Sequence, residues 1–401
     1  MRVARGLRDG RGVWGGGVIW GARGRRATVG VLVAGLAGLT AGCGGGAAAK
    51  APTHQAADAA VPAPLSMVTS TATSDATWAT VPMGATAGPN QFWELFTRPA
   101  GSPRWRLETP PGIATNGAII LASRGGTLTA GIRPSIDLTF SPVTSTADGG
   151  RNWATSSPQT GLAGHPDALA AAPDGHLIAD GQDNQISVLA PHGVTWSRLT
   201  SKNALAAATG CGLTAVTAVA YTPAGTALAG GNCGQPGLAG IFERTGAGWR
   251  AAGPPLPAPL TGQPVQVIRL TRTPAGDVAV LQAGPSLIAA WRGADGSWTE
   301  SAVLKIAGGD PSSVTFDNKK GLAVVTAGGR AQTVSGPGRA WRALPALPAS
   351  RSVALALPAG ASPEALAAAG GTLTVWRLTG SRWAKAQTIK VPIQYGSSSG
   401  S

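Results

Sequence analysis

Short runs of Val, Ile, Leu, Ala and Thr recur along most of the chain, and turns that contain Gly and Pro separate them. Apolar runs of this kind between turn residues are typical of β-strands. In one stretch the pattern predicts strands over residues 213–221, 226–230 and 239–243. Trp249 then opens a fourth run, so the repeating unit is predicted to hold four short strands.

A turn recurs between the first two predicted strands of these units. Proline and glycine preset its backbone dihedrals. In five units the middle of the turn lies 22 to 25 residues before the next tryptophan, so the units share one register. The five turns are Pro173-Asp174-Gly175, Pro223-Ala224-Gly225, Pro274-Ala275-Gly276, Asp317-Asn318-Lys319 and Pro358-Ala359-Gly360.

Seven tryptophans mark the repeat, and each follows a short polar turn. Their spacings of 42 to 53 residues fit four strands per unit and exceed the period of helical-pair or leucine-rich repeats. We therefore predict an all-β chain that forms a seven-bladed β-propeller, or a six-bladed one if the first unit supplies only a closing strand. Each tryptophan is expected to pack between adjacent blades or against its own turn. The seven are Trp105, Trp153, Trp196, Trp249, Trp298, Trp341 and Trp383.

The two ends of the predicted propeller, residues 77–395, need a way to close the ring. The alternating run Thr388 to Gln394 could pair with an N-terminal strand, which would remove an exposed sheet edge. We expect this run to close the ring and residues 396–401, rich in Gly and Ser, to form a disordered tail.

The formal net charge of +14 is concentrated in part at the N-terminus, where residues 1–26 carry seven Arg and one Asp. The remaining basic residues are scattered and do not alternate with aromatic residues, as a groove that follows a nucleic-acid strand would require. We therefore expect no nucleic-acid partner and interpret the charge as an ordinary basic surface.

Residues 27–40 form an uncharged apolar segment that follows Arg23, Arg25 and Arg26 and is short for a membrane span. It ends in Leu39-Thr40-Ala41-Gly42-Cys43, which resembles the lipobox of bacterial lipoproteins. The resemblance implies a signal peptide over residues 1–42, lipidation of Cys43 and anchoring at the outer face of the cell membrane. The alternative is a plain secretory signal with an incidental cysteine. Residues 43–76, rich in Ala, Pro and Thr, are predicted to be a disordered tether.

The stretch from Thr146 to Trp153 resembles the Asp-box, Ser/Thr-x-Asp-x-Gly-x-Thr-Trp, with Asn152 in place of Thr. The resemblance is to BNR-repeat, sialidase-like propellers, and the overall layout resembles that of actinobacterial lipoproteins. It implies that the box lies in the turn between the third and fourth strands, opposite the ligand face. Its residues would then stabilise the fold and take no part in catalysis; they are Thr146, Asp148, Gly150 and Trp153.

The same resemblance raises a glycoside hydrolase of the sialidase class as the alternative function. Such an enzyme needs three arginines, a tyrosine nucleophile with a glutamate partner and an acid/base aspartate. The stretch Gly131-Ile132-Arg133-Pro134 resembles the Arg-Ile-Pro motif of that family, which would place Arg133 on the ligand face with Asp137 nearby. The two tyrosines are Tyr221, within a predicted strand, and Tyr395, in the tail, so we expect no catalytic residues.

Other chemistry has little support in the sequence. The four histidines show no metal-ligand spacing, and we expect no metal or cofactor. Residues 180–184 could form a calcium-like cluster, and a hydrated polar loop is the alternative. Cys211 and Cys233 flank a predicted hairpin that would bring them to the same end, so outside the cytoplasm we expect a disulfide, with two free thiols as the alternative.

These observations favour a monomeric, lipid-anchored propeller that acts as a binding or scaffolding module for a protein or a cell-envelope glycan. Its ligand face should be formed by loops between the second and third strands. The residues in or beside those loops that we select as candidates are Arg133, Asp137, Asp180, Asp183 and Arg330.

Overall fold

The computed structural model falls into two units, Met1–Thr53 and His54–Ser401, and all of the described structure belongs to the second. The predicted signal peptide, Cys43 and the tail lie outside the described residues. Within the described part of the chain, no helix has the length and apolar character needed to cross a membrane. The described ranges are 69–84, 91–111, 117–133, 140–154, 162–181, 183–246, 248–273, 276–317, 319–348 and 353–391.

Seven groups of antiparallel strands, called sheets I to VII in chain order, account for nearly all the described strands, and a parallel pairing of β1 with β23 joins sheets I and VI. Sheet I contains β1 (Ser70–Ala72), β2 (Ala76–Gly84), β3 (Gln91–Pro99) and β4 (Arg106–Leu107). Sheet II contains β5 (Ala118–Arg124), β6 (Thr127–Arg133) and β8 (Val143–Thr146), with the pair β7 (Phe140–Ser141) and β9 (Leu162–Ala163) separate from it. Sheet III contains β10 (Pro166–Ala171), β11 (Leu177–Gly181), β12 (Gln185–Leu189) and β13 (Ser197–Ser201).

Sheet IV contains β14 (Leu213–Tyr221), β15 (Ala227–Cys233), β16 (Gly240–Arg244) and β17 (Trp249–Ala251). Sheet V contains β18 (Gln266–Thr273), β19 (Gly276–Ala283), β20 (Ser286–Arg292) and β21 (Trp298–Glu300), and β22 (Leu304–Lys305) also pairs with β20. Sheet VI contains β23 (Ser313–Phe316), β24 (Leu322–Val325), β25 (Ala331–Val334) and β26 (Arg342–Ala343). Sheet VII contains β27 (Val353–Ala356), β28 (Glu364–Ala369), β29 (Thr372–Thr379) and β30 (Arg382–Lys390). Two short helices, α1 (Lys202–Ala207) and α2 (Ala258–Thr261), lie in connections between sheets.

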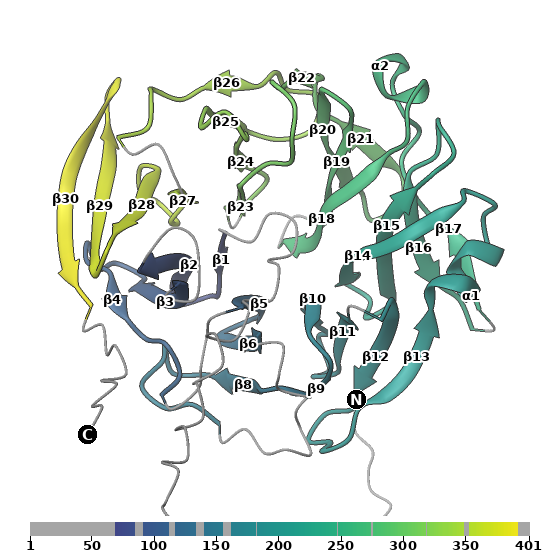
Figure 1. Ribbon diagram of the computed structural model, residues 1–401, viewed down its shortest axis with the longest axis horizontal. Coiled ribbons are helices and arrows are strands. Elements are labelled where there is room, and N and C mark those ends of the chain that lie inside the picture. The colour runs from purple at the N-terminus through teal and green to yellow at the C-terminus, as the bar shows by residue number, and fades with distance from the viewer. Residues whose placement is uncertain are drawn as a thin grey trace, which may run out of the picture. The chain divides into compact units, whose positions relative to one another are not determined.

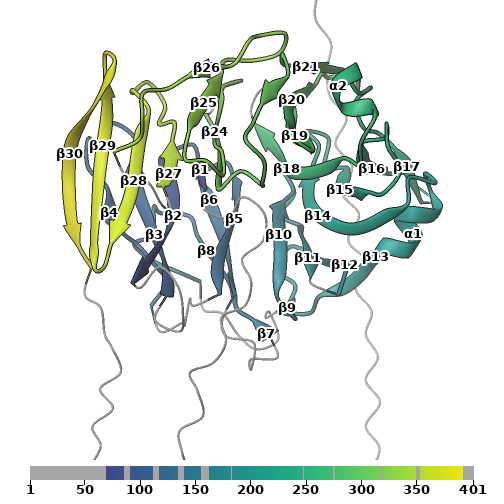
Figure 2. The ribbon, with the colours of Figure 1, turned by 45° about the horizontal axis from the view of Figure 1, so that its top comes forward.

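The sheets stand side by side around a common centre, each with its first strand innermost (Figure 1). Hydrophobic clusters fill the interfaces between neighbouring sheets. One cluster spans sheets VII, I, II and III, and four further clusters lie between III and IV, IV and V, V and VI, and VI and VII. Figure 2 shows the same succession with sheet VII beside both sheet VI and sheet I. This closed array is a seven-bladed β-propeller, which confirms the predicted fold, and its blades are sheets I to VII.

Several of the repeat tryptophans link one blade to the blade before it. Nε1 of Trp298 in blade V donates to the carbonyl of Ala252, which follows blade IV, at 2.7 Å. Nε1 of Trp341 and of Trp383 donates in the same way to a carbonyl that follows the preceding blade, at 2.9 and 3.1 Å. The period seen in the sequence therefore reflects a recurring inter-blade contact.

The ring closes differently from the predicted way. The run from Thr388 enters β30, the half-exposed outer strand of blade VII, which pairs with β29 along its length. The alternation of that run is the pattern of an outer strand, so the prediction of a closing strand is wrong.

The N-terminal strand β1 takes part in the closure of the ring, because it pairs in parallel with β23 of blade VI. Ser70 and Thr315 are the paired residues, and the hydroxyl groups of these two side chains are hydrogen-bonded to each other. Because β1 lies within residues 43–76, the predicted tether extended too far and the body begins before residue 77.

Candidate functional site

The propeller has two faces that differ in which connections form them. The turn face carries the turns between the first and second strands and between the third and fourth strands of each blade. The loop face carries the loops between the second and third strands and the connections from blade to blade. The sequence placed the ligand site on the loop face.

The predicted loop-face residues do not converge on one open site. Arg133 ends β6 and Asp180 lies in β11, and both are fully buried. Asp183 and Arg330 are exposed in second-to-third-strand loops of blades III and VI. Asp137 lies outside the described residues. The structure therefore groups Arg133, Asp180 and Asp183 at the junction of blades II and III and leaves Arg330 apart.

Arg133 is held by an internal ion pair that the sequence did not predict. Its Nη1 donates to Oδ1 of Asp167 at 2.7 Å and to the carbonyl of Pro166 at 3.2 Å. A β-bulge at the start of β10 adds Asp167 to the strand, and bulges redirect side chains. Burial lowers the pKa of Arg133 and raises that of Asp167, while each charge opposes the effect of burial on the other. The pair stabilises the junction of blades II and III and leaves little of Arg133 for a ligand.

Asp180 lies behind this pair and carries an unusual buried carboxyl group. Neither of its side-chain oxygens has a hydrogen-bond partner among the described residues. Burial, with added repulsion from Asp167 and Asp183, raises its pKa well above the usual value. The described ranges also contain no group of three His, Cys, Asp or Glu side chains arranged to hold a metal ion. A buried Asp180 without a partner among the described residues is consistent with a structural position.

The Asp-box turn lies on the turn face, between β8 and Trp153. Oδ1 of Asp148 accepts from the backbone N–H of Asn152 at 3.0 Å, and the Thr146 hydroxyl accepts from that of Gly150 at 3.0 Å. The hydrogen bonds from Asn152 lower the pKa of Asp148 to about 2. Gly150 has φ of +95°, and a Cβ there would meet the Glu108 side chain at 2.9 Å, so glycine is required. All of these contacts are within the fold.

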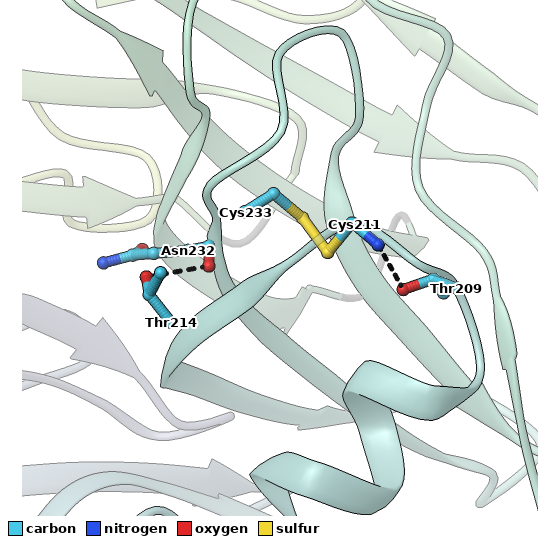
Figure 3. Close-up of a disulfide and its surroundings, with 5 residues drawn as sticks. All are labelled: Thr209, Cys211, Thr214, Asn232 and Cys233. Carbon is cyan, nitrogen blue, oxygen red and sulfur yellow. Dashed lines mark hydrogen bonds between the residues drawn. A yellow bond between two sulfur atoms is a disulfide. The ribbon is translucent and has the colours of Figure 1, made fainter.

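Cys211 and Cys233 are joined by a disulfide with Cα atoms 5.3 Å apart (Figure 3). Cys211 precedes β14 and Cys233 ends β15, so the bond ties an inter-blade connection to a second-to-third-strand loop. Cys233 N–H also donates to the carbonyl of Val265, next to blade V, at 3.0 Å. The disulfide therefore fixes the loop-face end of blade IV, and the hydrogen bond from Cys233 to Val265 links that end to the start of blade V.

A cavity of about 900 Å³ opens on the turn face, where the first-to-second-strand turns of blades I, II, III, V, VI and VII meet. Its size is that of a small-molecule or peptide pocket, which is typically about 300–1,000 Å³. Most residues of the described lining are small. They include seven Ser or Thr residues and several Ala, Gly and Pro residues, and Phe316 supplies the aromatic ring. We call this cavity the turn-face hollow.

Three arginines and one aspartate supply the charged side chains in the described lining of the hollow. Arg98 is 11% exposed, donates from Nε to the carbonyl of Ser102 and lies 3.7 Å from Glu364. Arg124 is exposed and donates to the carbonyl of Pro173 at 2.9 Å, whereas Arg272 is exposed on β18. Asp317 accepts the backbone N–H groups of its own turn at 2.7 and 2.8 Å. The hollow is therefore positively charged.

The sequence predicted some of these turns but not the site that they form. Pro173, Asp317 and Pro358 belong to turns identified from the repeat, and all three line the hollow. Nothing in their local sequence marks them as ligand-binding, because the hollow exists only where the turns of six blades meet. None of Arg133, Asp180, Asp183 and Arg330 lines it.

Neither a protein-family model nor a curated protein sequence matches the chain. Among solved structures, the GH74 xyloglucanase from Xanthomonas campestris is similar at 14% identity and a TM-score of 0.53, over 81% of this chain and 53% of the enzyme. The chain thus spans about half of that enzyme's length. A putative 6-phosphogluconolactonase from Bacteroides uniformis (13% identity, TM-score 0.49, 80% and 98% coverage) and YCF48 from Cyanidioschyzon merolae (17%, 0.44, 80% and 95%) are also similar. At these identities the likeness supports the propeller fold alone.

The described residues give no support to the sialidase alternative. Tyr221 is buried in β14, and burial raises its pKa further above the ordinary value, so it is neither accessible nor activated. Tyr395 lies outside the described residues. The described lining of the hollow includes no Tyr or Glu beside its arginines. A nucleophile and its partner are thus missing from this lining.

Proposed function

We propose that this protein is a lipid-anchored, extracytoplasmic binding module whose propeller holds a protein or cell-envelope glycan at the turn-face hollow. The observation that carries the proposal is the hollow itself, a cavity of about 900 Å³ lined by hydroxyls and arginines. One carboxylate, Asp317, is present in the described lining, and the backbone of its own turn already engages it. A sialidase would need a tyrosine nucleophile with a glutamate partner at this position, and the described lining holds no Tyr or Glu, so this lining favours binding.

The anchoring part of the proposal rests on the lipobox-like sequence that ends at Cys43. Labelled palmitate should enter the full-length protein, and Cys43→Ala should lose the label and release the protein from the membrane fraction. Label in the Cys43→Ala variant, or wild-type protein without label, would refute the anchor.

The binding part is tested with full-length protein immobilised and exposed to fractionated cell-envelope proteins and glycans. Ala361 is exposed and lines the hollow, so Ala361→Trp should obstruct it with little effect on the core. A component retained by the wild type and lost with Ala361→Trp supports the hollow as the site. The matched control is Arg330→Ala on the loop face, which should keep the component. Equal retention by wild type and Ala361→Trp would refute this site.

A further inference from the structure

The described lining of the hollow has three arginines and one aspartate, so positive charge is in excess there, and the acids of the turn face are held by partners within the protein. Asp148, Asp295 and Asp317 accept hydrogen bonds within their own turns. Glu108 pairs with Arg106 at 2.7 Å, and Glu243 with Arg250 and Arg292 at 2.5 and 3.0 Å. Asp75, exposed beside the lining residue Ser74, accepts from the Thr73 hydroxyl at 2.7 Å, and among the described residues it forms no ion pair with an arginine of the hollow.

Arg124 and Arg272 are the cations of the hollow that remain open to a ligand. Within the described chain, neither has a carboxylate oxygen within 4 Å of its guanidinium group. Asp277 is close enough to Arg272 to interact electrostatically, but it lies 3.9 Å from Arg292. The two arginines come from blades II and V, so a ligand that reached both would lie across the hollow.

The remaining described lining combines hydroxyl groups with small Ala, Gly and Pro residues and offers little surface for stacking. Seven hydroxyl-bearing residues line the hollow, whereas Phe316 supplies its aromatic ring among the described lining residues. Guanidinium and hydroxyl groups donate to carboxylates, and Arg clusters are a recurring means of recognising acidic peptide motifs. The apolar faces of sugar rings pack on large aromatic side chains, and Phe316 is the single aromatic residue of the described lining. The hydroxyl-bearing lining residues are Thr71, Thr73, Ser74, Thr77, Ser123, Thr271 and Thr273.

We infer that the turn-face hollow binds an acidic peptide segment of a partner protein, with carboxylates on Arg124 and Arg272. This inference rests on the proposed function and names the ligand class of the same site. Attraction between exposed charges is screened by salt, so affinity should fall as ionic strength rises. Each arginine should contribute about fivefold to affinity, the effect of an exposed ion pair of about 1 kcal/mol.

The test uses full-length protein and a fluorescent hexaglutamate peptide, with hexaglutamine as the neutral probe. Hexaglutamate should bind, hexaglutamine should not, and the double variant Arg124→Ala/Arg272→Ala should lower affinity at least tenfold. Ala361→Trp should abolish binding. The charge-matched control, Arg330→Ala/Lys390→Ala, removes two exposed cations at the loop face and should keep wild-type affinity.

Three outcomes would overturn the inference. Equal loss in the two double variants would show non-specific attraction to a basic protein. Absence of hexaglutamate binding would refute an acidic peptide ligand, and tighter binding of a galacturonic acid hexamer would assign the hollow to an acidic glycan. The broader proposal fails separately, because it depends on palmitate labelling at Cys43 and on retention of an envelope component that Ala361→Trp abolishes.

Discussion

Removal of the Glu364 carboxylate should strongly destabilise the propeller, because this side chain joins its last blade to its first. Glu364 starts β28 and is completely buried. Its Oε2 accepts from Nε1 of Trp105 in blade I at 2.7 Å, and its Oε1 accepts from Arg377 at 2.7 Å. Arg98 of blade I lies 3.7 Å away. One carboxylate thus contacts Trp105 and Arg98 across the closure of the ring and Arg377 within its own blade.

The expected magnitude follows from what each substitution leaves behind. Glu364→Ala leaves the nearly buried Arg98 and the buried Trp105 indole without this acceptor, and loss of one partner of a buried ion pair costs about 3–5 kcal/mol. Glu364→Gln keeps the shape and one acceptor oxygen, so its cost should be smaller, about 1–3 kcal/mol. The control is Arg106→Ala, which removes a 45% exposed partner of Glu108 and should change stability by less than about 1 kcal/mol.

Urea unfolding of the full-length variants measures these differences as changes in the free energy of unfolding, provided that the m-value is unchanged. The expected order of stability is Arg106→Ala, then Glu364→Gln, then Glu364→Ala. A loss with Glu364→Ala no larger than that with Arg106→Ala would refute the view that this carboxylate closes the ring.

Three further predictions concern the disulfide and two aspartates. Cys233→Ser should abolish the difference in gel mobility between reduced and oxidised protein. It should also lower the free energy of unfolding by about 3 kcal/mol, because the bond to Cys211 closes a loop with a sequence separation of 22. A gel-mobility difference that persists in Cys233→Ser would contradict the bond. Asp148 has a pKa lowered to about 2, so its contribution to stability is present above its unfolded pKa of about 3.9 and is lost as the pH falls towards 2. The urea midpoints of wild type and Asp148→Ala should converge over that window, and a constant difference would argue against the hydrogen bonds. Asp180 has a raised pKa, so its ionisation costs stability at neutral pH and this cost disappears as the pH falls through the folded pKa towards about 3.9. Asp180→Asn should therefore raise the urea midpoint at pH 7 and flatten its dependence on pH, whereas a lower midpoint would be inconsistent with a buried, unpartnered carboxyl.

The repeat was predictable from the sequence because each blade satisfies the same local requirements. The strand predicted over residues 213–221 is β14 residue for residue, and the next two predicted strands overlap β15 and β16. Turn residues fix where these strands end, and the tryptophans recur because each contacts the preceding blade or its neighbouring cluster. Local sequence therefore determined the fold of a blade.

Ring closure was not predictable in the same way, because it depends on contacts between distant residues. The segment β1 has the sequence Ser-Thr-Ala and lacks large apolar side chains, so it has the composition of the preceding tether. What makes it a strand is its place at the centre of the ring, where Thr69 and Ser70 bond to Val314 and Thr315. No residue near them in sequence indicates this pairing.

Prediction of the candidate site failed for a related reason. The charged residues chosen on the loop face were selected by their position after the second strand. Two of them, Arg133 and Asp180, are buried at the junction of blades II and III. Arg98, Arg124 and Arg272 share no sequence motif. They line the same hollow because closure of the ring places the turns of their blades next to one another.

The hollow and the closure of the ring share residues, so ligand binding and stability should be linked. Arg98 lines the hollow and faces Glu364, and the carbonyl of Pro103, also in the lining, accepts from Arg377 at 3.1 Å. Unfolding separates the six blades whose turns form the hollow, so a ligand that spans it binds the folded ring alone. At a ligand concentration about 100 times Kd, such a ligand adds about 2.7 kcal/mol to the free energy of unfolding. The closure contacts would then serve binding as well as folding, because they hold Arg98 and the turn containing Pro103 at the edge of the hollow.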